Sequence, residues 1–299
     1  MPPLPAAAPK KGLIERVALI TLVGLSVVSV LGVALVTVYL NRINDSTSAL
    51  ARTDAMPAYV GRPQPVAAAN GSAPMNFLVL VTTSDSLDAV VVANLSASRR
   101  SLTLITVPAN LAVPATPSQT LASSYALDPA ITVRAMEGLT GARMDHQIRL
   151  DLTCFAAAID TVGGVDLAGT HLNGNQAVQK TRLGSDSSNT ALATGSLIRA
   201  ALIGANDHFG LLDPSRFPKM IDTINPCLQV DTGLTAEVIQ STLVESSVHP
   251  QDTRLWPLAA RSSTTGLTAD ASASQALREA LASPDLVTTA QYQQATLLP

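Results

Sequence analysis

Hydrophobic and polar positions follow different patterns along the chain, and the changes of pattern divide it into segments. Residues 17–40 form one uncharged apolar run, longer than the about 20 residues that a transmembrane helix needs. Residues 41–74 are rich in Ala, Pro, Ser and Thr without periodicity, which indicates a spacer after a cytoplasmic tail, residues 1–16, and the span. Residues 75–258 alternate short apolar runs with amphipathic stretches, as an α/β domain does, and residues 259–299 form a predicted C-terminal tail.

The first half of the domain predicts three strands and two helices. Residues 77–81 are continuously apolar, as in a strand that is buried on both faces. The apolar runs at 89–95 and 101–107 are separated by a turn short enough to make a hairpin. Residues 121–126 and 131–139 then follow helical spacing and lead into the central block.

The central block runs from Gly138 to Leu167 and predicts a strand, a helix and a second strand. Apolar residues alternate up to Leu152. From there an apolar stripe at the spacing i, i+3, i+4 and i+7 runs through Leu152, Phe155, Ala156 and Ile159. Asp151 is a favourable N-cap for this helix, and Gly163 with Gly164 ends it. We therefore expect a βαβ unit at the centre of the domain. The polar, glycine-bearing residues 171–189 after it predict an exposed loop.

The apolar run at 17–40 has a predicted orientation. Lys10, Lys11 and Arg16 precede it, whereas only Arg42 follows closely, so the N-terminus is expected in the cytoplasm and the domain outside. A cleaved signal peptide is the alternative, with residues 49–51 as a weak cleavage site. The run exceeds the ~7–15 apolar residues of a signal peptide, which favours a single-pass anchor in the cytoplasmic membrane.

Composition narrows the function classes. The formal net charge is −3 and 14% of residues are charged, so no basic surface predicts nucleic-acid binding. Cys154 and Cys227 are too few for a zinc ribbon, and outside the cytoplasm they are candidates for a disulfide; two buried thiols are the alternative. The sequence contains no GxSxG, P-loop, GxGxxG or HExxH motif, and it assigns no catalytic residue.

The central block resembles the signature of the LytR-CpsA-Psr family, whose members attach glycopolymers to the bacterial cell wall. The resemblance extends from Asn76 to about Ser247. Supporting segments occur in the family's order: residues 86–89 where the family has RSDT, 106–110 where it has SIPRD, and 172–178 where it has LDGEQAL. The resemblance implies an apolar tunnel for a polyprenyl-pyrophosphate-linked glycan, arginines that bind the diphosphate, and carboxylates that place Mg²⁺.

Most of the family's polar residues are replaced here. The carboxylate after the first strand falls at Thr83, and the arginine and aspartate of SIPRD fall at Ala109 and Asn110. The second arginine of a later RxR falls at Gly184, and an arginine-rich run falls at the uncharged residues 187–195. Asp88 remains at the RSDT aspartate, as the candidate metal ligand. Arg182 remains at the first arginine of RxR, as the candidate substrate-binding residue.

These observations predict a three-layer α-β-α domain with a mixed central sheet, held outside the membrane by one transmembrane helix. The first functional hypothesis is a catalytically degenerate family member that binds a polyprenyl lipid or an envelope partner. The second is an active phosphotransferase that joins glycopolymers to peptidoglycan, and the third is a structural scaffold with a filled tunnel. We expect membrane lipid as a partner, with polyprenyl-linked glycan or peptidoglycan as further candidates. No cofactor is expected, other than Mg²⁺ in an active enzyme.

Overall fold

The computed structural model describes residues 45, 48–54, 56–67, 72–113, 120–184, 186–209, 222–263 and 266–292. Residues 46–299 form one compact unit. Within the described ranges, no helix combines the length and the apolar character that a membrane crossing requires. The span predicted at 17–40 lies outside the described residues, so its prediction stays a prediction.

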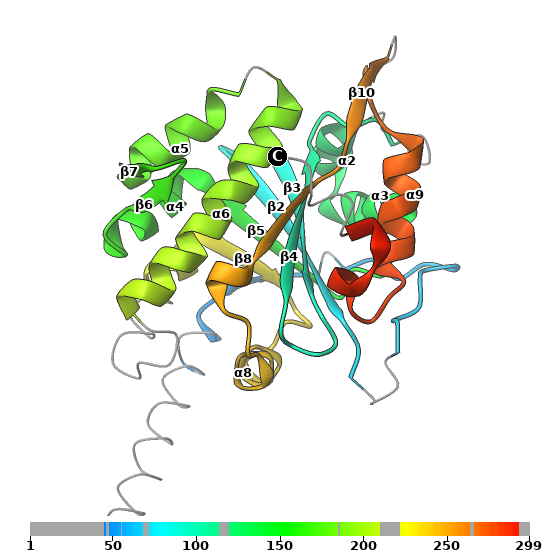
Figure 1. The fold of residues 1–299 in the computed structure, drawn as a ribbon, viewed down its shortest axis with the longest axis horizontal. Helices are drawn as coiled ribbons and strands as arrows, with labels where there is room; N and C mark the ends of the chain where they lie inside the picture. Colours follow the sequence, from blue (N-terminus) through cyan, green and yellow to red (C-terminus); the bar gives the residue numbers. More distant parts are fainter. Residues whose placement is uncertain are drawn as a thin grey trace, which may run out of the picture. The chain divides into compact units, whose positions relative to one another are not determined.

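A seven-stranded mixed sheet forms the centre of this unit (Figure 1). Its order is β1-β8-β5-β2-β3-β4-β9. The pairs β1/β8, β2/β5 and β4/β9 are parallel, and the remaining three pairs are antiparallel. The strands are β1 (Ala51–Thr53), β2 (Met75–Thr83), β3 (Ser86–Leu95), β4 (Leu102–Pro108), β5 (His146–Asp151), β8 (Leu228–Asp231) and β9 (Arg254–Pro257). The mixed sheet and the predicted β3–β4 hairpin are confirmed.

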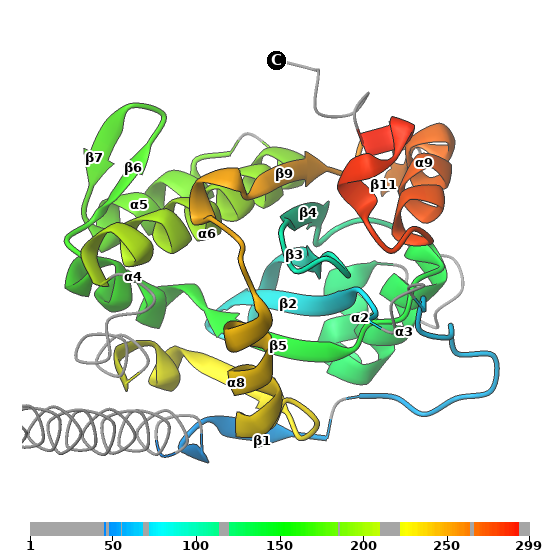
Figure 2. The same cartoon turned by 60° about the horizontal axis from the view of Figure 1, so that its bottom comes forward.

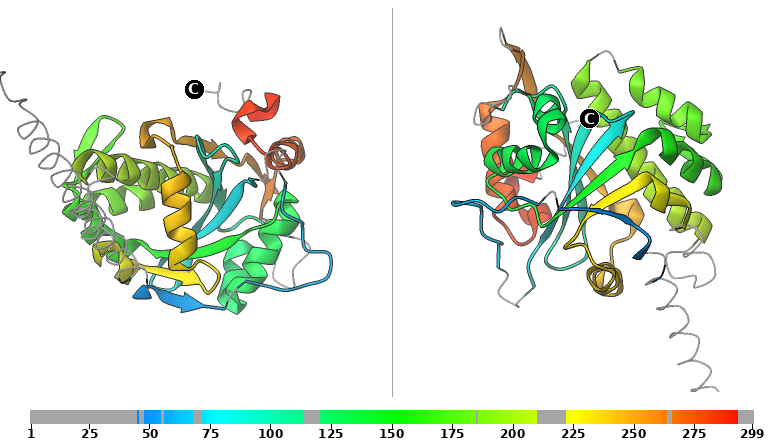
Figure 3. Two further views of the ribbon diagram at one scale, coloured as in Figure 1. Left: turned by 90° about the horizontal axis from the view of Figure 1, so that it is seen from below. Right: turned by 180° about the vertical axis from the view of Figure 1, so that it is seen from behind.

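Helices cover both faces of the sheet and give the unit its three layers (Figures 2 and 3). Alternate residues of β2 enter two different cores, because successive strand side chains point to opposite faces. One face packs against α2 (Leu121–Leu127), α3 (Pro129–Thr140) and α9 (Ala271–Leu281). The other packs against α4 (Leu152–Thr161), α5 (Gly174–Arg182) and α6 (Ser187–Phe209). A further helix, α8 (Ala236–Glu245), packs on a small separate core beside β8.

The predicted βαβ unit is only partly correct. β5 and α4 form as expected, and the Asp151 side chain accepts the N–H groups of Thr153 and Cys154 as the N-cap. The second strand, β6 (Val165–Leu167), does not join the central sheet. It pairs with β7 (Thr170–Leu172) through a two-residue turn, Ala168–Gly169, in which both residues have positive φ. This tight hairpin uses the backbone groups of β6 locally, so no crossover strand forms.

A disulfide joins Cys154 of α4 to Cys227 of the 3₁₀ helix η1 (Asn225–Cys227), with the two Cα atoms 5.2 Å apart. The link connects positions 73 residues apart in the sequence. It fastens the segment before β8 to the helix that covers the sheet centre.

The C-terminal residues do not form the predicted tail. Strands β10 (Ala260–Ser263) and β11 (Gly266–Ala269) make a hairpin, and α9 and the 3₁₀ helix η3 (Leu286–Thr288) follow. Leu277, Leu281 and Leu286 are each 1% exposed and belong to the core on the α2–α3 face. A hydrophobic stripe at helical spacing was present, but its Ser- and Ala-rich surroundings concealed how much surface it buries. The domain therefore continues past residue 258.

Part of the predicted spacer also belongs to the domain, because β1 pairs with β8 and residues 59–62 bind α3. Glu137 has a side chain that is 0% exposed, and its carboxylate accepts from the Tyr59 hydroxyl at 2.7 Å, from Arg62 Nε at 2.9 Å and from the Met144 N–H at 3.0 Å. Burial, followed by the bond to Glu137, raises the pKa of Tyr59 to about 12, so its hydroxyl stays a donor.

We expect Glu137→Gln to lower the free energy of unfolding by about 3–5 kcal/mol, because it leaves Arg62 without its buried counter-charge and turns an amide N–H₂ toward donors. Chemical denaturation measures this loss. Glu279→Gln is the matched control, because Glu279 is exposed and binds only glutamine amides in this region. A loss below about 1 kcal/mol for Glu137→Gln would contradict the expected role of the carboxylate.

Asp231, at the end of β8, is 2% exposed and fixes the junction with β5. Its carboxylate accepts from the N–H groups of Gln147 at 2.9 Å, Gly233 at 2.8 Å and Leu234 at 3.1 Å, and it lies 3.2 Å from His146 Nδ1. Burial alone would raise the pKa of Asp231, but the bonds from His146, Gln147 and Gly233 outweigh it and hold the pKa below its ordinary value of 3.8.

A lowered carboxyl pKa stabilises the fold above the unfolded-state pKa, and this stability is lost as the pH falls through the folded-state pKa. We therefore expect the free energy of unfolding to drop below about pH 4. Asp231→Asn should be less stable than wild type at neutral pH and should show a shallower acid loss. Asp166→Asn, at an exposed carboxylate, should keep the wild-type slope. Equal slopes for all three proteins would exclude Asp231 as the source.

Candidate functional site

The candidate site is the end of the sheet where β2 turns into β3. Thr83 pairs with Ser86, so the turn consists of Ser84 and Asp85 alone. Both have positive φ, 46° and 67°, as a tight hairpin turn requires, although glycine or asparagine is the usual choice there. This turn places Thr82, Thr83 and Asp88 at one end of the sheet.

Asp88 occupies an irregularity in β3. Val81 pairs with Ala89 and Thr82 pairs with Leu87, so Asp88 has no partner on β2 and forms a β-bulge. Bulges redirect side chains and are frequent beside functional sites. The Oδ2 atom of Asp88 is buried and has no hydrogen-bond partner among the described residues. A buried carboxylate oxygen without a partner is costly, so this atom is suited to receive a ligand.

Arg182 is the last residue of α5, in the segment that the sequence predicts as a loop. The helix forms because Asn173 and Gln176 make a capping box, in which each side chain accepts the backbone N–H of the other residue. The guanidinium of Arg182 is exposed and donates to Thr83 Oγ1 at 3.0 Å. The structure therefore brings Arg182 to the same end of the sheet as Asp88.

A second arginine, Arg149 of β5, was not selected from the sequence. It forms an ion pair with Asp85 of the turn, and its Nε atom lies 3.5 Å from Thr82 Oγ1. Arg149 also acts on Tyr125 of α2. Burial raises the pKa of the Tyr125 hydroxyl, and the positive charge of Arg149 partly offsets this rise. The signal in the sequence was a charged residue between two apolar positions of a strand, which ordinarily marks a solvent-facing side chain.

The two arginines approach the turn from opposite faces of the sheet. Thr82 follows Leu80 on the face of α2 and α3, whereas Thr83 follows Val81 on the face of α4–α6. Arg149 therefore belongs to the first face, and Arg182 to the second. Arg149 does not take the place of an arginine that is missing beside Arg182.

An apolar cavity of about 180 Å³ lies on the Arg182 face, between the sheet and helices α4 and α6. Val79 of β2 is part of its wall, two positions before Val81 and four before Thr83 on the same face of the strand. Helix α4 contributes Phe155 and Ala158, and the segment before β8 contributes Ile224. The cavity wall contains neither Asp88, which lies on β3, nor Arg182, which ends α5.

The replaced family positions differ in where they lie. Ala109 is 5% exposed and belongs to the core on the α2–α3 face, whereas Asn110 is exposed. Residues 187–195 form the first turns of α6 and carry no charged side chain. The charged groups that the resemblance calls for at these positions are thus absent, and a buried core residue stands at one of them.

The residues that could hold Mg²⁺ are few. Within the described ranges, no three His, Cys, Asp or Glu side chains form a metal-binding group. Mg²⁺ is often held by one or two carboxylates together with substrate phosphates. Asp88, with its unpartnered Oδ2, fits a site of that kind, in which phosphate oxygens would supply the other ligands.

Comparison with known proteins was made by sequence and by structure. No family model and no curated protein matches the sequence. Among solved structures, a LytR-Csp2A-Psr enzyme from Actinomyces oris is similar, with a TM-score of 0.62, 19% identity, and coverage of 79% of this chain and 97% of that one. TagV from B. subtilis is similar with a TM-score of 0.56 and 14% identity, and the match covers 70% of this chain and 95% of TagV. A structure of TagT bound to LI-WTA has a TM-score of 0.56 and 12% identity, and the match covers 78% of this chain and 96% of TagT. The chain therefore has the fold of the LytR-CpsA-Psr proteins, which confirms the resemblance of the central block.

Proposed function

We propose that this chain is a membrane-anchored, extracytoplasmic LytR-CpsA-Psr protein of the bacterial cell envelope that binds a polyprenyl phosphate and is catalytically degenerate. The observation that carries this proposal is the position of the apolar cavity and Arg182 on one face of β2. An apolar chain in the cavity and a phosphate at Arg182 would occupy consecutive parts of that face.

The dimensions support a ligand that spans both parts. Val79 and Thr83 are four residues apart, about 13 Å along an extended strand. A cavity of about 180 Å³ is close to the roughly 150 Å³ that admits benzene in an engineered protein, so it holds only part of a prenyl chain as it stands. Each buried CH₂ contributes about 0.8 kcal/mol, so even a few carbons give a measurable contribution. The remaining open volume also counts against the structural scaffold with a filled tunnel.

The polar residues support degeneracy. Thr83 stands where the family has a carboxylate, and its hydroxyl accepts a hydrogen bond from Arg182. Ala109 is buried, and no charged residue occupies the start of α6. Loss of one preorganised charge-stabilising group costs about 10²–10³ in rate. The loss of several groups that act together leaves little transfer activity.

An active phosphotransferase that joins glycopolymers to peptidoglycan is the second candidate, and the bulge at Asp88 favours it. In that case Asp88 would hold Mg²⁺ together with diphosphate oxygens, and the ion would supply neutralisation of charge on the leaving diphosphate. Arg182 would pair with phosphate oxygens from the cavity side. A structure of TagT, a protein with the same fold, carries bound LI-WTA, which supports a lipid-linked glycan as the ligand class here.

The binding proposal predicts distinct effects for two neighbouring alanines of α4. Ala158→Leu should fill the cavity and weaken farnesyl phosphate binding about tenfold or more, whereas Ala157→Leu, at an exposed position, should leave it unchanged. Arg182→Ala should weaken farnesyl phosphate but not farnesol. Titration of the full-length protein in detergent measures all three, and thermal unfolding checks that each variant is folded. Equal affinities for Ala158→Leu and Ala157→Leu would rule out the cavity as the prenyl site.

The degeneracy proposal predicts no glycan transfer from a polyprenyl-diphosphate donor to peptidoglycan above the rate without protein, with Mg²⁺ present. A chromatographic assay of the released polyprenyl phosphate measures it. Turnover that both Asp88→Ala and Arg182→Ala abolish would instead establish the second candidate, because those two residues are the surviving members of the polar site.

A further inference from the structure

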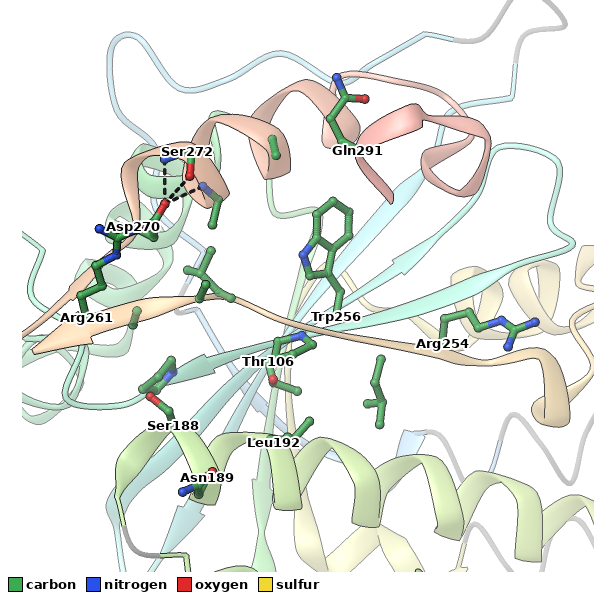
Figure 4. A pocket seen from close by; sticks show the side chains of 18 of the residues that line it. Thr106, Ser188, Asn189, Leu192, Arg254, Trp256, Arg261, Asp270, Ser272 and Gln291 are labelled. Carbon is green, nitrogen blue, oxygen red and sulfur yellow. Dashed lines mark hydrogen bonds and ion pairs between the residues drawn. The ribbon is translucent and has the colours of Figure 1, made fainter. Parts of the chain in front are cut away.

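Helix α9 separates a groove from a pocket. Ala276 lines the groove, which runs along β9 (Figure 4), whereas Arg278 lines the pocket. Residues two positions apart point to nearly opposite sides of a helix, so the groove and the pocket lie on different sides of α9. In the groove, Asp270 pairs with Arg261 and accepts from the Ser272 N–H group, so the carboxylate of its lining is already bound. The pocket is the smaller and the more apolar of the two, as sites for small molecules are.

This α3–α9 pocket lies where the two helices are side by side (Figure 1). Its volume is about 560 Å³, within the roughly 300–1,000 Å³ of small-molecule sites. Gly138 of α3 leaves part of this space open, because a Cβ atom there would meet no atom of another element within 4 Å. The wall is mostly apolar and includes the side chains of Pro63, Ala112, Val113, Ala135 and Leu139. The pocket can therefore receive a small apolar group.

Arg134 of α3 supplies one positive charge at the pocket. Its guanidinium carbon lies 4.8 Å from the centre of the Tyr59 ring, which is a cation–π contact. Its side chain makes no ion pair or hydrogen bond with the described residues. A guanidinium group carries five N–H donors, so those of Arg134 can all serve a ligand.

Arg278 of α9 brings a second positive charge to the same pocket. Its Nε atom donates to the Leu139 carbonyl oxygen at 2.8 Å, and its Nη2 atom donates to that of Gly138 at 3.3 Å. These bonds fix the guanidinium at the end of α3, while Nη1 has no partner in the described part of the chain. Arg134 and Gly138 are four residues apart and so are neighbours on one face of α3. The two guanidinium groups therefore flank one part of the pocket.

Glu137 is the carboxylate of the pocket lining, and it does not cancel these two charges. Its side chain is 0% exposed and pairs with Arg62, which is not part of the lining. The Tyr59 hydroxyl and the Met144 N–H group also donate to it. The charge of Glu137 is thus already balanced, and the two remaining arginines favour an anionic ligand.

We propose that the α3–α9 pocket binds a small amphipathic carboxylate, in which an apolar ring or short chain bears one carboxylate group. The carboxylate would pair with Arg134 and Arg278, because a planar guanidinium matches two carboxylate oxygens. The apolar body would pack on the wall that includes Val113 and Leu139. The pocket is on the α2–α3 face of the sheet, opposite the apolar cavity, so the inference does not depend on the proposed lipid ligand.

The ligand would also hold the N-terminal segment of the domain to the helices. Tyr59, Gly61 and Pro63 form one side of the pocket, and α3 and α9 form the others. A molecule that contacts all three parts stabilises their closed arrangement, because it binds only that arrangement. Amide hydrogen exchange in residues 59–62 should therefore slow when the pocket is occupied.

The test is calorimetric titration of the full-length protein in detergent with 2-naphthoate, 2-naphthamide and acetate, each against a protein-free micelle blank. 2-Naphthoate should bind. The neutral amide and acetate, which lacks the apolar body, should bind at least tenfold more weakly. Arg134→Gln should weaken 2-naphthoate about tenfold, as expected for one charge-assisted contact, and leave the amide unchanged. Arg100→Gln, at an exposed turn, should change neither.

Gly138→Leu tests the location, because leucine would fill the pocket and is a better helix former than glycine. It should weaken 2-naphthoate at least tenfold and abolish the slowed exchange of residues 59–62. Ala126→Leu, at an exposed position of α2, should do neither. Ala158→Leu, in the wall of the apolar cavity, should also leave 2-naphthoate binding unchanged.

Three results would overturn the proposal. One is no saturable binding of 2-naphthoate up to about 1 mM, and another is binding of the amide as tight as that of 2-naphthoate. The third is binding that Ala158→Leu removes and Gly138→Leu keeps, which would place the probe in the apolar cavity. Farnesyl phosphate binding should be unaffected by Gly138→Leu, so the pocket and the proposed lipid site can fail independently.

Discussion

The burial of β2 on both faces is the constraint on which the rest of the structure depends. Leu78 and Leu80 enter one core, while Val79 and Val81 pack on the other, so layers of helices are needed on both sides. The strand can remain apolar only while both layers cover it. Polar side chains begin at Thr82, which is still 0% exposed, and the strand becomes partly exposed at Thr83, where the tight turn to β3 follows. The position of the candidate site is thus a consequence of where the double burial ends.

Apolar and polar parts of such a site respond differently to substitution. The cavity wall is made from residues that also hold the helices on the sheet, such as Phe155 and Ile159, so the requirement for a stable core preserves it. A cation or carboxylate at the sheet end contributes little to folding and can be replaced without loss of the fold. An apolar replacement such as Ala109 even joins the core. This difference would allow the scaffold and its cavity to persist in a catalytically degenerate protein of the kind proposed above.

Local patterns in the sequence predicted much of the fold and less of the site. The first strands, α2, α3, β5 and α4 follow directly from apolar spacing and from the Asp151 cap, since these signals act within a few residues. The separation of β6 from the sheet depends on a hairpin turn at Ala168–Gly169, and the burial of α9 depends on distant packing. Arg182 could be placed by resemblance alone. Arg149 could not be found, because its pairing with Asp85 arises only once two strands lie side by side.

Because part of the predicted spacer belongs to the domain, the chain that connects the domain to its predicted anchor is shorter than the sequence indicates. A spacer that covered residues 41–74 would span more than 100 Å when fully extended. With Leu50 already buried and β1 paired in the sheet, the connection from the predicted span shortens to residues 41–49, or about 30 Å at most. The predicted tether is therefore less than a third as long as the sequence alone suggests.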